Sequence, residues 1–126
     1  YPGYYFCKPA WEGQYGLGLQ CNNYGERMVF GVTREKDRIG RRPFCEELLN
    51  AVAALHPSAR THAWWEARMT MNTPVAISPT IDWRKPEVLW QMHTSKKFGE
   101  EVAEKLLAVA RISEPIVDRL VRKYRK

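Results

Sequence analysis

The feature that most constrains the fold is a pair of alternating segments joined by a short turn sequence. Residues 15–21 read YGLGLQC and residues 28–33 read MVFGVT, so one set of alternate positions is strongly apolar in each. This period of two is expected of a strand that buries one face. The NNYG sequence at residues 22–25 favours a turn, because Asn and Gly tolerate positive φ. The two segments therefore predict an antiparallel hairpin with one apolar face.

The other face of the first predicted strand is nearly bare, because Gly16 and Gly18 lie on it. A glycine in a strand often marks a close approach of another group, such as a backbone or a flat ring. We favour close packing against a helix or an aromatic side chain, with a ligand site as the alternative.

The residues before the hairpin predict an edge strand and a closed end of the core. The sequence YPGYYF at residues 1–6 is aromatic, but Pro2 and Gly3 would confine a strand there to an edge or an irregular start. Trp11 stands just before the hairpin, and we expect it to close one end of the core.

The middle of the chain predicts one amphipathic helix and one further strand. A charged loop at residues 34–42 precedes Pro43, which is suited to the first turn of a helix that ends before Pro57. Residues 57–62 read as a linker. Residues 63–71, AWWEARMTM, mix strand-forming residues, and we expect a strand there.

The C-terminal third predicts two helices. Apolar residues recur at spacings of three and four from Phe98 to Ala110. Pro115 should then interrupt the helix, with Ser113 as the N-cap of a second one. Pro86 could open a further short helix. The sequence thus predicts an α+β fold, with an antiparallel hairpin-based sheet of three to four strands packed against two to four helices.

Length and composition predict one domain, over residues 1–126. Because the chain starts at Tyr1, we expect it to be the C-terminal part of a longer protein. No apolar run is long enough for a membrane span. The cysteines Cys7, Cys21 and Cys45 form no CxxC pair, so we expect buried reduced thiols, no metal site, no cofactor and a cytoplasmic location.

Two clusters of basic residues are candidates for binding a polyanion, in a chain of net charge +6. Phosphates attract such clusters because binding releases counterions. The alternative is that both are solvated surface, and at a helix end cations also complement the macrodipole. If the two clusters adjoin in space, the case for nucleic acid improves. The candidate residues are Arg38, Arg41 and Arg42 in the charged loop, and Arg119, Arg122 and Lys123 in the last helix.

The tryptophans are a second candidate surface. Trp64 and Trp65 cannot both face inward on a strand, so one of them should be partly exposed or packed against another element. An exposed Trp among arginines could stack on a base. Together with Trp83, the pair could instead form a surface for a protein partner or a homodimer.

Catalysis has little support in the sequence. No nucleophile elbow, phosphate-binding loop or zinc-protease motif occurs. A small hydrolase using His62 and Glu66, with Cys45 as nucleophile, is the weakest of the hypotheses. We expect no catalytic residue in this chain and no enzyme activity of this fragment alone.

The order of features resembles the C-terminal half of the PD-(D/E)XK nuclease-like proteins of bacteria and phages. The matching pieces are Trp11, the YGLGLQC strand, the second strand ending in Phe-Gly-Val at residues 30–32, the pair at Trp64 and the Asp-Trp at residues 82–83. An amphipathic helix separates these strands from the tryptophan pair, and a helical C-terminal end completes the order.

That resemblance implies a fragment without an active site. In the family, an Asp followed by Glu-x-Lys holds a divalent metal in the N-terminal half, and no Glu-x-Lys, Asp-x-Lys or Gln-x-Lys occurs here. The leading hypothesis is a non-catalytic accessory domain of a nuclease-like protein that presents basic surface to DNA or RNA. The alternative is a protein-interaction or dimerisation module with a tryptophan-rich surface.

Overall fold

The structure is a computed structural model that describes residues 3–22, 27–71, 86, 90, 93–94 and 96–125. A strand, a short 3-10 helix and a hairpin come first: β1 (Gly3–Phe6), η1 (Pro9–Trp11), β2 (Tyr15–Asn22) and β3 (Arg27–Arg34). Two helices, a second hairpin and a long helix follow: α1 (Lys36–Ile39), α2 (Glu46–Leu55), β4 (Arg60–His62), β5 (Trp65–Thr70) and α4 (Lys96–Tyr124).

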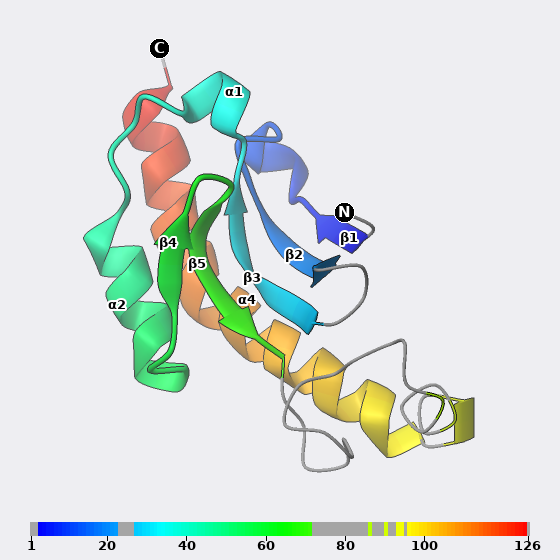
Figure 1. Cartoon of the computed structure of the whole chain (residues 1–126). Coiled ribbons are helices and arrows are strands. Elements are labelled where there is room, and N and C mark those ends of the chain that lie inside the picture. Colours follow the sequence, from blue (N-terminus) through cyan, green and yellow to red (C-terminus); the bar gives the residue numbers. More distant parts are fainter. Residues whose placement is uncertain are drawn as a thin grey trace.

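The strands form one antiparallel sheet in the order β1-β2-β3-β5-β4, with the long helix α4 behind it (Figure 1). The predicted hairpin is the centre of this sheet, because β2 and β3 pair along their whole length. The predicted edge strand pairs with β2, Phe6 facing Leu17. The α+β class is confirmed, and the sheet has one strand more than the upper number expected.

The core lies between one face of the sheet and the helices α2 and α4. Alternate residues of β2, β3 and β5 contribute to it, as the period of two predicts. Leu48 and Val52 of α2 and Val117 of α4 are fully buried against them. We call this face of the sheet the core face, and the opposite one the outer face.

Trp11 closes one end of the core, as expected from its position before β2. Its ring is buried, and its indole Nε1 donates a hydrogen bond of 2.8 Å to Asp118 on α4. Lys8 donates to the same carboxylate at 3.1 Å. The start of the chain is thereby attached to its last helix.

Several predicted boundaries are wrong. The charged loop contains the helix α1, and α2 begins at Glu46 rather than at Pro43. Residues 57–62 are no simple linker, because Arg60–His62 forms the edge strand β4. Pro115 does not divide the C-terminal helix: α4 runs continuously through it, and Ser113 is no N-cap but donates to the carbonyl of Val109 at 2.6 Å. Proline removes one helical hydrogen bond, and the burial of Ile116 and Val117 immediately after it outweighs that cost.

The backbone of β3 requires a glycine at its centre. Gly31 has a φ of +149°, and a Cβ there would lie 1.9 Å from the carbonyl oxygen of Ala67 on β5. No L side chain fits this space, so Gly31 lets β3 and β5 pair closely next to the bulge between them.

The expected buried thiols are only partly found. Cys7 is free and exposed, because it follows the edge strand β1, and Cys45 is free and half-buried just before α2. The side chain of Cys21 lies outside the described residues. The possible helix at Pro86 falls in a part of the chain described only at single positions, of which Pro86 and Trp90 are helical.

Candidate functional site

The structure brings the two predicted basic segments together. The Arg42 guanidinium lies 4.2 Å from the centre of the Tyr124 ring, near the end of α4, and Lys123 lies 5.3 Å from the same ring. Figure 1 shows the C-terminal end of α4 beside α1, which is part of the charged segment at residues 34–42. Arg42 also donates to Gln14 Oε1 at 2.8 Å, so it links α4 to the start of β2.

Three of the six predicted cations have no hydrogen-bond or ion-pair partner among the described residues, and a fourth, Arg42, is the one that contacts Tyr124. Arg41, Arg122 and Lys123 are exposed, and the structure records no hydrogen bond or ion pair of these side chains with any residue it describes. Arg42 is half-buried between Gln14 and Tyr124. We call Arg41, Arg42, Arg122 and Lys123 the basic cluster.

The other two predicted cations have partners within the chain. Arg38 donates to the backbone carbonyl of Glu12, and Arg119 forms an exposed ion pair with Glu47 on α2. This ion pair raises the pKa of Arg119. We therefore leave Arg38 and Arg119 out of the basic cluster, since an anion would have to compete with these contacts.

A buried ion pair holds the charged segment on the sheet. Arg34 at the end of β3 lies 3.4 Å from the carboxylate of Glu66 on β5, and both side chains are at most 2% exposed. The second guanidinium nitrogen of Arg34 donates to the carbonyls of Ile39 and Arg42, each at 2.7 Å. The chain between α1 and α2 thus wraps around the Arg34 side chain.

Glu66 completes this arrangement from the other side. Its second carboxylate oxygen accepts from the backbone N–H of Cys45 at 3.1 Å. Burial raises the pKa of Glu66, while the Cys45 N–H and the Arg34 charge act in the opposite direction. The pair therefore anchors both ends of the segment that carries Arg41 and Arg42, and neither of its charged groups faces solvent.

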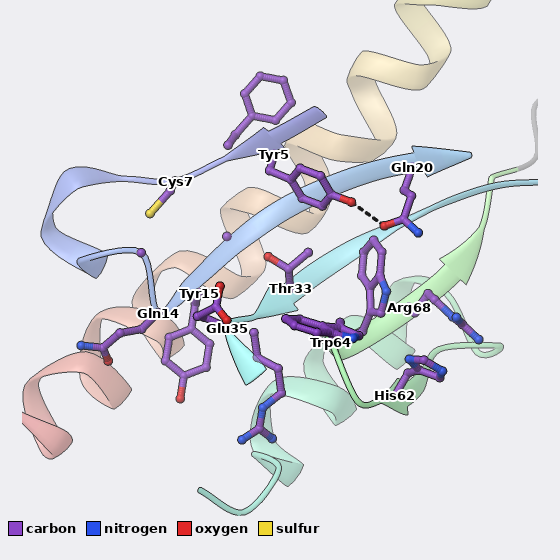
Figure 2. A pocket seen from close by; sticks show the side chains of 15 residues that line it. Tyr5, Cys7, Gln14, Tyr15, Gln20, Thr33, Glu35, His62, Trp64 and Arg68 are labelled. Atoms are coloured by element: carbon purple, nitrogen blue, oxygen red, sulfur yellow. Dashed lines mark hydrogen bonds between the residues drawn. The ribbon is translucent and has the colours of Figure 1, made fainter. Parts of the chain in front are cut away.

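A cavity of about 510 Å³ lies on the outer face of the sheet, within the size range of small-ligand sites. Figure 2 shows Tyr5, Gln20, Thr33 and Trp64 on this side of the strands. Gly16 also lines it. The cavity therefore borders one of the two glycines from which an open outer face was predicted.

The tryptophan pair divides between floor and rim of this cavity. Trp65 is buried, and its ring lies so close to the outer face that a Cβ on Gly18 would meet it at 2.9 Å. An aromatic ring thus packs on the glycine, as expected. Trp64 precedes β5, in the turn after β4, and is 44% exposed at the rim. Trp83 lies outside the described residues.

The hydrolase candidates do not converge. His62 lines the cavity, whereas the Glu66 carboxylate is held by Arg34 and Cys45 on the buried side. Among the residues that the structure describes, no three His, Cys, Asp or Glu side chains lie close enough to hold a metal ion. Within the same residues, no helix is long and apolar enough to cross a membrane.

Three residues of the outer face were missed by the sequence reasoning: Tyr5, Arg60 and Arg68. Tyr5 and Arg60 lie on the edge strands β1 and β4, and Arg68 lies on the interior strand β5; no sequence pattern distinguished these side chains from ordinary surface. The glycines that face Tyr5 and Arg68 in the sheet were the available signal. No family model, curated protein or solved structure matches the chain.

Proposed function

We propose that this domain binds nucleic acid without catalysing a reaction, through the basic cluster at the end of α4. The single observation that carries the proposal is the contact of Arg42 with Tyr124, which joins two basic segments about 80 residues apart in the sequence. Cations gathered on one surface attract phosphates more strongly than the same charges dispersed.

Two acidic side chains close to the end of α4, Glu12 and Asp118, have partners within the chain. Glu12 pairs with Arg125 at 3.2 Å, and Asp118 accepts from Lys8 and Trp11. These hydrogen bonds lower the pKa of Asp118, so its charge persists at neutral pH but is shared with Lys8. These two carboxylates therefore compete less with a phosphate for the exposed cations of the cluster.

The resemblance to PD-(D/E)XK nuclease-like proteins supports an accessory role in a larger protein. An accessory domain needs affinity for the sugar-phosphate backbone of the nucleic acid. Contacts with phosphates supply affinity and register without reading the base sequence. We accordingly propose a domain that holds DNA or RNA for a nuclease-like partner segment.

Charge reversal at the cluster tests the proposal. Arg122→Glu with Lys123→Glu should weaken the binding of labelled DNA, measured by fluorescence anisotropy, without altering the far-UV spectrum. The matched control is Lys96→Glu with Lys97→Glu, which changes the net charge equally. These lysines are exposed at the other end of α4, about 40 Å away at ~1.5 Å per residue.

Equal weakening in the two double variants would show that only net charge matters, and would remove the cluster as a site. Absence of binding in the unmodified protein at low salt would overturn the proposal itself. The alternative, a protein-interaction module, would then become the leading idea, because Trp64 is exposed. A mass that increases with concentration in sedimentation would support it.

A further inference from the structure

The outer face of the sheet carries a row of residues with an aromatic side chain at one end and two arginines at the other. In strand register, Tyr5 faces Gly18, Gly18 faces Gly31, Gly31 faces Arg68, and Arg68 faces Arg60. The two glycines in the middle carry no side chain, and the buried ring of Trp65 packs over Gly18 between the two ends of the row. Adjacent strands are ~4.8 Å apart, so Tyr5 and Arg68 stand about 14 Å from each other.

The opposition of Arg60 and Arg68 is a cost in the folded protein. Like charges directly across a strand pair repel each other. The Arg60 guanidinium donates hydrogen bonds to the carbonyls of Pro57 and Ala59, at 3.3 and 2.8 Å. No strand residue described on this face is acidic, so the sheet itself offers the pair no counter-charge. A bound anion would provide one.

The aromatic side chains at the cavity are exposed and held in place. Tyr5 is 55% exposed, and its hydroxyl donates to Gln20 at 2.5 Å, a bond visible in Figure 2. Trp64 sits in the turn between β4 and β5, where its carbonyl accepts from the Arg34 backbone N–H at 3.0 Å. The Tyr5 ring, held by its own hydroxyl, loses little freedom on stacking against a flat ligand, while for Trp64 it is the backbone of the turn that is held.

Charge around the cavity is mixed but favours an anion. Lys36 lies 5.7 Å from the centre of the Trp64 ring. Glu35 also lines the cavity, and its carboxylate accepts from the backbone N–H of Asp37, where it caps α1. Gln14 lines the cavity as well, and its side-chain oxygen accepts a hydrogen bond from Arg42 of the basic cluster. The cavity and the cluster are therefore adjacent.

We infer that this cavity holds unpaired bases of a single-stranded nucleic acid, stacked on Tyr5 and Trp64, with Arg60 and Arg68 on its phosphates. The inference rests on the proposed function and adds strand selectivity to it. Base stacking on aromatic side chains beside a cationic track is the general mode by which proteins bind single strands. In a duplex the base faces are stacked on one another, and a flat sheet face cannot reach them.

The test is fluorescence anisotropy with a labelled oligothymidine of about 15 nucleotides, within the ~4–16 nucleotides that one such surface covers. An oligouridine and a duplex of mixed sequence are measured in parallel. Trp64→Leu and Tyr5→Leu remove a stacking ring, whereas Trp64→Phe and Tyr5→Phe keep one. Thermal melting of each variant checks that the sheet remains folded.

We expect the unmodified protein to bind the single strands more tightly than the duplex. Each Leu variant should lose about 5- to 150-fold in single-strand affinity. The Phe variants should keep most of the affinity of the unmodified protein. Duplex binding should change little in any of the four. Quenching of tryptophan emission by the oligonucleotide should diminish in Trp64→Phe.

Two results overturn the inference while leaving the proposed function in place. One is salt-dependent binding that needs Arg122 and Lys123 but is unchanged in both Leu variants. The other is that thymidine monophosphate competes as well as the oligonucleotide, which would make the cavity a site for a free nucleotide. Absence of all binding, to single strands and duplex alike, refutes the proposed function as well.

Discussion

Removal of the Glu66 carboxylate should be among the most destabilising single changes in the protein. Glu66→Ala leaves the Arg34 guanidinium, whose side chain is 2% exposed, without its counter-charge. It also leaves the Cys45 N–H without the acceptor it now has at 3.1 Å. Breaking a buried pair in this way costs about 3–5 kcal/mol of unfolding free energy, a large share of the ~5–15 kcal/mol total of a typical domain.

The matched variant Glu66→Gln keeps the shape of the side chain and an acceptor for Cys45, but loses the charge. Its unfolding free energy should lie between those of the unmodified protein and Glu66→Ala. Urea denaturation followed by tryptophan emission gives the three values, provided that the denaturant slopes agree. A loss below about 1 kcal/mol in Glu66→Ala would refute the reasoning, because it would mean that the Arg34 charge is relieved by other groups.

Three other changes have defined outcomes in the same denaturation assay. Gly31→Ala should cost at least about 3 kcal/mol, because its Cβ would overlap a carbonyl of β5 at a positive φ; an unchanged midpoint would contradict the pairing of β3 with β5. Burial and the nearby Lys105 lower the pKa of His56 below 6.5, so the unfolded chain binds the proton more readily. Stability should fall as the pH drops through 6.5, and the variant His56→Asn should lose that part of the slope. Asp118→Ala should cost about 1–3 kcal/mol, because the buried Trp11 indole N–H loses its acceptor, and a cost near zero would show that water replaces it.

The central part of the fold was predictable because its signals are local. The alternation around Gly16 and Gly18 defined β2 and its bare outer face, and the turn residues placed β3 next to it. Trp11 and the edge strand followed from their positions beside that hairpin. In each case the residues that determine the element are adjacent in the sequence.

The parts that were missed depend on contacts between distant segments. The strand Arg60–His62 has three polar residues and no alternation, and it exists because β5 offers it an edge. The helix continues through Pro115 because buried residues on both sides, Val109 and Val117, pack against the sheet. Neither effect can be found in a local pattern.

The candidate site divides in the same way. Six basic residues were named from the sequence, but only the structure shows which of them meet at Tyr124 and which pair with glutamate or a carbonyl. The row from Tyr5 to Arg60 draws on five strands. The register of this row depends on the bulge between β3 and β5, and no pattern in the sequence predicted that bulge.

The most direct test of the central claim is the salt dependence of oligonucleotide binding by the unmodified protein. Four cations of the basic cluster predict a slope of log K against log salt near −2.8 for a single strand at ~0.7 per phosphate, and near −4 if Arg60 and Arg68 also contact phosphates. Arg122→Glu with Lys123→Glu should reduce the steepness of this single-strand slope by about 1.4, while the Lys96 and Lys97 control leaves it unchanged. A slope near zero, or no binding at low salt, would contradict the account.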